Sequence, residues 1–291
     1  MLGQLAAIIA PVLVCAAIGY LWARMRRPFE TEFVTALVTT IGTPCLIAST
    51  LLRFSVDFAA LGDMALATLA VFAIVGVGGA VGLRAAGLPF HSYLPALMFS
   101  NAGNMGLPLC LFAFGEPGLA LGIVFFTVSA VLQFTVGVGL AAGTLAPARL
   151  ARIPLLYAVA IALVLMATGT ALPDWIANTI ELLGGLTIPL MLIALGVSLA
   201  RLRIASLKLS VAIALLRLLV GFAVGLGVAW AFGLEGMAAG VLVLQSAMPV
   251  AVFNYLFAQV YKRAPEEVAG AVVLSTFLSF ASLPLLLYFV L

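Results

Sequence analysis

Residues 99–108 hold the most concentrated set of side chains that could form a binding site. Two asparagines, two glycines and a proline lie here within an otherwise apolar segment. Pro108 lacks a backbone donor and its ring displaces a carbonyl group, whereas Gly103 and Gly106 make unwinding of a helix easy. Backbone groups freed in hydrocarbon are costly unless they find partners. An interruption at this point must therefore lie within protein or line a cavity.

A second interrupted stretch, residues 245–254, combines Pro249 with several polar side chains. Amide and hydroxyl groups can bind a ligand, but they can equally satisfy the backbone groups that an interruption frees. Both roles stay open for each residue. The candidate ligand-contacting residues are Asn101 and Asn104 in the first stretch, and Gln245, Ser246 and Asn254 in the second.

The two interruptions would place helix ends in the interior of the protein. The N-terminus of a helix carries a positive partial charge equivalent to about half an elementary charge. Paired interrupted helices in the two halves of a membrane protein indicate a transporter whose site lies near the middle of the bilayer. The expected ligand is therefore an anion, and a carboxylate in particular.

Arg217 is the one basic residue well inside an apolar segment. A charge within a membrane span indicates a functional role by default, here the attraction of an anion or gating. Its long side chain could instead extend to the membrane surface. Gln133 is similarly open between a hydrogen bond to a neighbouring helix and contact with a ligand.

The other reactive residues form no catalytic or metal-binding set. The sequence has one histidine, and its three cysteines stand apart, each in an apolar stretch. The acidic residues fall in predicted loops or at the ends of predicted spans. Nucleophilic catalysis and metal binding both need clustered side chains, so we expect no enzyme activity, no metal and no cofactor.

Composition places the chain in a membrane. Of its 291 residues, 65% are hydrophobic and 8% are charged, with a mean hydropathy of +1.31. A soluble domain carries about 25% charged residues, so a soluble enzyme, a nucleic-acid-binding protein and a disordered scaffold are all excluded. Since a spanning helix needs about 20 apolar residues, the chain has room for several spans and for no separate soluble domain.

Charged residues, prolines and glycines divide the sequence into ten predicted spans. Lysines and arginines concentrate in and beside the odd-numbered loops, with Arg53 and Arg217 as the exceptions. Cytoplasmic loops are enriched in these residues, so we expect a multi-pass protein of the cell (inner) membrane with both termini outside. The spans are 3–23, 32–52, 62–85, 91–113, 117–144, 154–172, 176–200, 207–232, 237–260 and 266–290.

An odd number of spans in each half implies that the halves are inverted relative to one another. Shifting the sequence by 145 positions aligns Pro44 with Pro189 and Gly76 with Gly221. Internal similarity at a fixed offset indicates a repeat. We therefore predict a first five-helix repeat in residues 1–145, a short cytoplasmic linker in residues 146–153, and a second five-helix repeat in residues 154–291.

These residues also carry a family resemblance. Residues 101–108 resemble the N-x-x-x-M-G-I/L-P stretch in the fourth helix of the auxin efflux carrier family, which includes plant PIN carriers and bacterial malonate-type carriers. Residues 42–46, 194–199 and 249–261 agree with other stretches of that family. Asn254 is a departure, because plant carriers have a second proline there, and the short linker is another.

The resemblance implies an all-α integral membrane fold of the bile-acid-symporter and PIN type, with broken, crossing helices 4 and 9. It implies a scaffold of helices 1, 2, 6 and 7 and a moving transport domain of helices 3–5 and 8–10. The function implied is elevator-type secondary transport of a small organic anion, bound where the broken helices cross. A sodium-coupled symporter of the bile-acid-carrier type is the alternative. The expected partners are the substrate and the lipid bilayer, without nucleic acid, and a homodimer through the scaffold is one assembly open to it.

Overall fold

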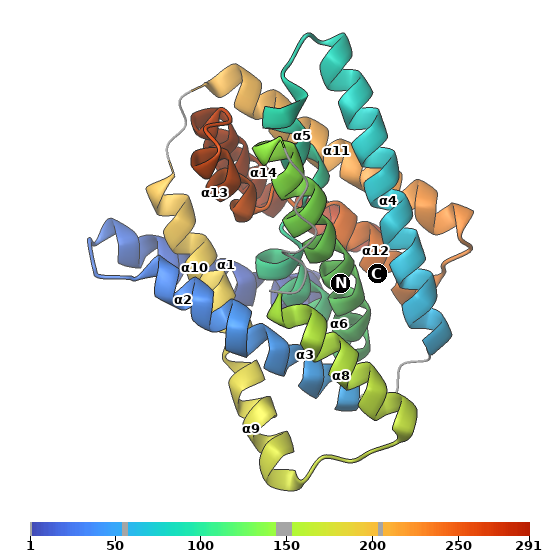
Figure 1. The fold of residues 1–291 in the computed structure, drawn as a ribbon. Helices are drawn as coiled ribbons and strands as arrows, with labels where there is room; N and C mark the ends of the chain where they lie inside the picture. Colours follow the sequence, from blue (N-terminus) through green and yellow to red (C-terminus); the bar gives the residue numbers. More distant parts are fainter. Residues whose placement is uncertain (1, 54–57, 144–152, 203–205) are drawn as a thin grey trace.

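A computed structural model describes residues 2–53, 58–143, 153–202 and 206–291, and these residues are almost entirely helical (Figure 1). They form no strand, and their one bridge of extended backbone joins Ser100 and Val250 in antiparallel fashion. The all-α prediction is confirmed for this part of the chain. The expected linker lies outside the described residues except for Ile153.

Among the described residues, three π-helical turns (η1 to η3) interrupt the helices. In chain order the elements are α1 (Leu2–Arg24), α2 (Thr31–Leu37), η1 (Val38–Gly42), α3 (Thr43–Arg53), α4 (Phe58–Ala85), α5 (Phe90–Met98), η2 (Ala102–Gly106), α6 (Leu107–Leu132), η3 (Gln133–Gly137), α7 (Val138–Ala142), α8 (Pro154–Thr168), α9 (Asp174–Gly185), α10 (Thr187–Arg201), α11 (Leu207–Ala231), α12 (Gly236–Ser246), α13 (Val252–Val260) and α14 (Pro265–Val290).

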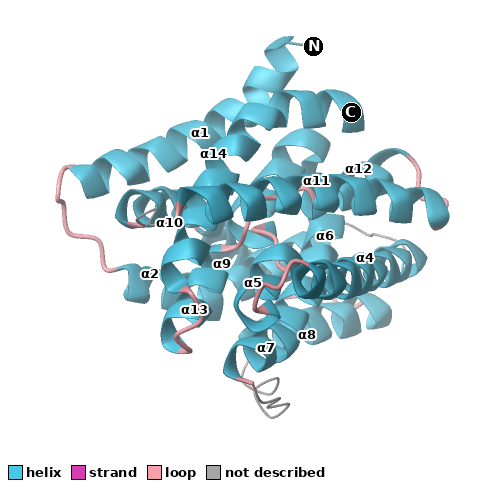
Figure 2. Ribbon diagram, turned by 90° about the horizontal axis from the view of Figure 1, so that it is seen from above, coloured by secondary structure: helices cyan, strands magenta, loops and turns pink. Residues whose placement is uncertain are grey.

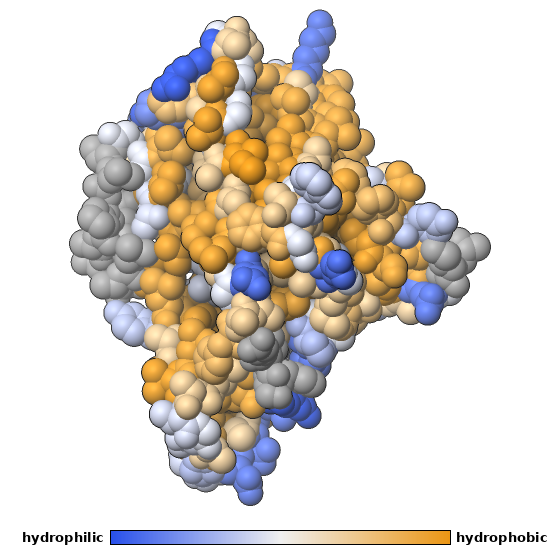
Figure 3. Space-filling view, turned by 90° about the vertical axis from the view of Figure 1, so that its right-hand side faces the viewer, coloured by the Kyte–Doolittle hydropathy of each residue, from blue (hydrophilic) through white to orange (hydrophobic). Residues whose placement is uncertain are grey.

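Seven helical stretches among the described residues are long and apolar enough to cross a membrane, and α8 and α12 are shorter apolar helices. Large apolar side chains lie on the outside: Trp230 is 86% exposed, Leu285 73% and Leu182 72%. Figure 3 shows hydrophobic surface across much of the face drawn, with hydrophilic residues in separate patches. An apolar exterior of this extent cannot face water. The chain is an integral membrane protein.

The stretch from α6 to α7 contains a reversal at Gly115. The backbone of Gly115 has φ 70° and ψ −165°, which only glycine adopts readily. A Cβ atom added to Gly122 would lie 3.1 Å from the Sγ atom of Cys110. Residues twelve apart lie about 18 Å apart in a straight helix, so α6 consists of two arms that fold back on each other.

Two sets of helices pack mainly among themselves. In the first, α1 packs on α10, and α3 packs on α8 and α9. A Cβ atom on Gly196 would overlap the carbonyl oxygen of Ala16, so the glycine allows the backbones of α10 and α1 to touch. In the second set, α11 packs on α14 and α12, and α4 packs on α5 and α6. Figures 1 and 2 both place the two chain termini near each other.

Candidate functional site

Two short extended segments pair with each other in the interior. Between α5 and η2 the chain is extended at Phe99 (φ −96°, ψ 110°), and between α12 and α13 it is extended at Ala251 (φ −65°, ψ 138°). The backbone N–H of Asn101 donates to the carbonyl oxygen of Pro249 at 2.7 Å, and the N–H of Ala251 donates to that of Phe99 at 3.1 Å. Each segment thus satisfies backbone groups that the other frees.

Of the residues expected to break the helices, one lies within an extended segment and three follow one. Pro249 lies within the second extended segment and is buried. Gly103 and Gly106 lie in η2 and Pro108 lies in the first turn of α6, so all three follow the first extended segment along the chain. A Cβ atom on Gly106 would overlap the side-chain oxygen of Gln245. This glycine therefore allows the two interrupted stretches to touch.

Asn254 holds the first extended segment in place. Its Nδ2 atom donates to the carbonyl oxygen of Phe99 at 3.0 Å, and its Oδ1 atom accepts from Nε2 of Gln133 at 3.1 Å. Asn254 is 2% exposed. Of the two roles open for Gln133, the hydrogen bond to another helix is present, because it joins η3 to α13.

Arg217 lies against the ends of two helices. Its guanidinium donates to the carbonyl oxygen of Leu97 at 3.2 Å and to that of Ser246 at 2.6 Å. These carbonyls are at the C-terminal ends of α5 and α12, where a helix carries negative partial charge. The side chain is 2% exposed and does not extend to the surface. The ion pair found among the described residues is Arg53 with Glu181, so the partners of Arg217 are neutral carbonyls.

A cavity of about 110 Å³ adjoins the first extended segment and the start of α13. All of its described lining residues are uncharged. They are Thr31, Val34, Thr35, Val38, Thr39, Thr43, Ser100, Asn101, Gly103, Asn104, Phe126, Ser129, Gln133, Met191, Ala194, Ala251, Val252, Phe253 and Leu256.

Two helices begin at this cavity. The helical run from Ala102 through η2 into α6 starts after Asn101, and α13 starts after Ala251. The first N–H groups of a helix have no partner within it and favour an anion. All three π-helical turns of the described chain also contribute lining residues, through Thr39, Asn104 and Gln133. Such turns are frequent at functional sites.

Two buried polar atoms beside this cavity have no partner in the described chain. They are Nδ2 of Asn101 and Oγ of Ser100, on residues that are 4% and 3% exposed. An unpaired buried donor costs about 1–3 kcal/mol. A ligand that accepts a hydrogen bond from Asn101 would remove this cost.

The predicted site residues divide into two groups. Asn101 and Asn104 line the cavity, and Asn254 lies behind it, bonded to the lining residue Gln133. Gln245 and Ser246 do not line it. The Nε2 atom of Gln245 donates to the carbonyl oxygen of Gly122 at 3.4 Å, and both residues are fully buried between helices.

Sequence reasoning missed the opposite wall of the cavity. Four lining threonines lie at four-residue intervals: Thr31, Thr35, Thr39 and Thr43. Residues four apart share one face of a helix, so this spacing was a signal in the sequence. The spacing alone does not identify a cavity wall, because threonine commonly bonds to its own helix, as Thr39 does to the carbonyl oxygen of Thr35 at 2.8 Å.

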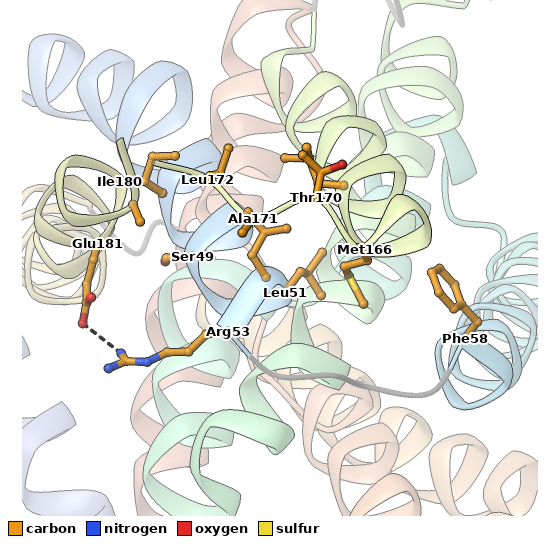
Figure 4. A pocket seen from close by; sticks show the side chains of 14 residues that line it. Ser49, Leu51, Arg53, Phe58, Met166, Thr170, Ala171, Leu172, Ile180 and Glu181 are labelled. Carbon is orange, nitrogen blue, oxygen red and sulfur yellow. Dashed lines mark hydrogen bonds and ion pairs between the residues drawn. The ribbon is translucent and has the colours of Figure 1, made fainter. Parts of the chain in front are cut away.

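A larger, more open cavity of about 750 Å³ lies elsewhere, between α3, α8 and α9 (Figure 4). Figure 4 shows the side chain of Arg53 directed toward Glu181 at one edge of this cavity. Phe58 lies at the opposite edge. None of the predicted ligand-contacting residues lines it. The 110 Å³ cavity is the better candidate site, because helix N-termini and an unpaired amide meet there.

Comparisons with known proteins all point to membrane transporters. Residues 140–287 match the family described as membrane transport protein. An uncharacterized transporter of Methanothermobacter thermautotrophicus is 28% identical over 294 residues, covering 94% of each chain. An uncharacterized transporter of Methanocaldococcus jannaschii is 26% identical over 192 residues, covering 62% of this chain and 61% of its own.

Proposed function

Because this chain belongs to the membrane transport protein family, that of the auxin efflux carriers, it is a membrane transporter, and we propose that its cargo is a small organic anion. The observation that carries the proposal is the 110 Å³ cavity, where two helices begin beside the unpaired amide of Asn101. A carboxylate there would accept hydrogen bonds from Asn101 and from free N–H groups at both helix starts.

In this proposal Arg217 is a positioning residue. Its two hydrogen bonds join the carbonyl ends of α5 and α12, and these two helices precede the extended segments that pair beside the cavity. The positive charge of Arg217 is attracted to the negative partial charge at the C-terminal ends of both helices. In this proposal Arg217 affects cargo binding only by holding the backbone that shapes the cavity. The positive partial charge of the two helix starts attracts the anion.

The proposed transport mechanism is an elevator. The cavity is lined on one side by α2, η1, α3 and α10, and on the other by residues 100–104, α6, η3 and α13. In this proposal the helices of the first side, together with α1, α8 and α9, form the scaffold. The second belongs to the transport domain, with α4, α5, α7, α11, α12 and α14. Movement of one set against the other would carry the cavity across the membrane.

The proposed topology has ten spans in two inverted repeats. It counts the two arms of α6 separately and treats α5 with the start of α6, and α12 with α13, as interrupted spans that cross at the paired segments. The cavity reaches Thr31, which follows the basic residues Arg24, Arg26 and Arg27. By the positive-inside rule this end is cytoplasmic. The cavity then opens inward, and both termini lie outside the cell membrane.

The test is uptake of radiolabelled small carboxylates by vesicles that contain the purified chain, at pH 8 to limit passive entry of the neutral acids. We expect saturable uptake of at least one carboxylate. Asn101→Ala should reduce it about tenfold or more, since a hydrogen bond to a charged group contributes about 1.5–3 kcal/mol. Asn178→Ala, the same change on the exposed face of α9, is the control.

Two outcomes would overturn parts of this proposal. Undiminished uptake by Asn101→Ala would remove that residue from the site, and single-channel current steps would replace a carrier by a channel. Repeating the assay without sodium separates the alternatives for coupling. Uptake that needs sodium would favour the sodium-coupled symporter over a carrier that moves the anion alone.

A further inference from the structure

We infer that the cavity selects a carboxylate with a single negative charge and a short apolar tail, and discriminates against dicarboxylates. This inference rests on the proposed function and names the class of substrate. It is carried by three observations on the cavity: the positive charge at the two helix starts, the uncharged lining away from them, and its size.

The positive charge available in the cavity matches one carboxylate. No lysine, arginine or histidine is among the described lining residues. The two helix starts, at Ala102 and Val252, each contribute about half an elementary charge. Together they supply about one, and the unpaired Nδ2 atom of Asn101 adds one uncharged donor.

Arg217 contacts Ser246 of the second interrupted stretch and Arg201 contacts the lining residue Thr31, and both arginines donate to groups other than a cargo. Arg217 donates to the carbonyl oxygens of Leu97 and Ser246, and none of these three residues lines the cavity. Arg201 donates to the Oγ1 atom of Thr31 at 2.7 Å and to the carbonyl oxygen of Phe29 at 3.0 Å. Those bonds are exposed, so water and salt screen the charge of Arg201.

A second carboxylate would meet no positive charge among the described lining residues. Away from the helix starts, the lining combines the neutral threonines with the apolar side chains of Val34, Val38, Phe126, Met191 and Leu256, and none of these residues carries a charge. Burial of a charged group without a partner is strongly unfavourable. An apolar tail at the same place gains free energy for each methylene group removed from water, about 0.8 kcal/mol.

The size of the cavity limits the tail. A buried cavity of about 150 Å³ accommodates benzene, and this one measures about 110 Å³. By this comparison a cargo of about six non-hydrogen atoms is near the upper limit of what the cavity accommodates. An aromatic acid with two fused rings is too large for the cavity in this conformation.

The test is calorimetric titration of the purified full-length chain at pH 8 with butyrate, malonate and malonamate. Malonamate has the shape of malonate with one carboxylate replaced by an amide, so the pair isolates the second charge. We expect butyrate and malonamate each to bind at least tenfold more tightly than malonate. Butyramide, which has no charge, should not bind measurably.

The outcomes separate this inference from the proposed function. Malonate binding as tightly as butyrate, or malonamate binding no better than malonate, would overturn the inference while leaving an anion site in place. If no carboxylate in a wider panel binds or is transported, the proposed function itself fails. Butyramide binding as tightly as butyrate would show that charge has no part in recognition and would overturn both.

A variant can reverse the preference. Thr35 is half-buried in the cavity wall, so Thr35→Lys places a cation near the proposed tail. We expect the ratio of malonate to butyrate affinity to rise at least tenfold in this variant. Thr179→Lys, on the exposed face of α9, should leave the ratio unchanged. An unchanged ratio in Thr35→Lys, with the variant folded as judged by its melting temperature, would contradict the electrostatic argument.

Discussion

Replacing Arg217 by methionine tests whether this side chain holds the two interrupted helices together. Methionine is an unbranched apolar side chain, and it has no donor for the carbonyl oxygens of Leu97 and Ser246. Each carbonyl left unpaired in the interior costs about 1–3 kcal/mol. The variant also gives up the cost of burying a guanidinium, which offsets part of this loss. We therefore expect a net destabilisation of about 2–3 kcal/mol.

The assay is thermal unfolding of the purified chain in detergent, followed by tryptophan fluorescence. One kcal/mol corresponds to about 2–4 °C in the melting temperature of a chain of about 150–250 residues, so Arg217→Met should melt roughly 5–10 °C lower. Arg217→Lys keeps the charge but loses the planar fork that reaches two carbonyls, and should show a smaller decrease. Leu216→Met, on the half-exposed neighbouring position, should change little.

Melting temperatures within about 1 °C of wild type for both Arg217 variants would refute the positioning argument. A second readout separates positioning from a general loss of stability. The affinity of butyrate, measured well below the melting temperature, should fall in Arg217→Met, because the extended segments that shape the cavity follow the two capped helices. Wild-type affinity in a destabilised variant would restrict Arg217 to a structural role.

Three further changes test other contacts. Gly221→Ala should lower stability by about 1–2 kcal/mol in thermal unfolding, because its Cβ atom would overlap the carbonyl oxygen of Ser246; Gly227→Ala, with open space on the same helix, should be neutral or stabilising, and equal effects would contradict the packing. Gln133→Ala removes the donor to Asn254 and should weaken carboxylate binding several-fold in calorimetry, so unchanged affinity would argue against that link. Arg53→Gln breaks an ion pair whose side chains are 59% and 57% exposed; surface pairs contribute about 0–1 kcal/mol, and a larger fall in melting temperature would show that this pair is more than a surface contact.

The apolar segments, and the charged residues, prolines and glycines between them, were enough to predict an all-helical membrane protein. Apolar segments of spanning length predict helices, because a chain in hydrocarbon must satisfy its own backbone. The polar, proline-containing stretches 99–108 and 245–254 coincide with the two places where extended segments pair. The family resemblance was also confirmed. The ten-span inverted repeat and the substrate stay predictions.

The roles of individual polar residues could not be predicted in the same way. Asn101 and Gln245 are both buried amides in interrupted stretches, yet Asn101 lines the cavity and Gln245 packs against Gly106. Which direction an amide faces depends on neighbours far away in sequence. The cavity wall formed by Thr35 and Thr39 is a similar case, because a threonine stripe has the same sequence whether it lines a cavity or bonds to its own helix.

By itself the sequence determined that this chain lies in a membrane, and it predicted two interrupted helices and one arginine well inside an apolar segment. These properties follow from local composition, since hydrocarbon penalises each unpaired polar group wherever it lies. Only the tertiary structure decided that Arg217 joins two helix ends and that two helix starts share one small uncharged cavity. Those facts depend on contacts such as Arg217 with Leu97 and Ser100 with Val250, which are more than a hundred positions apart, and no local pattern specifies which distant groups meet.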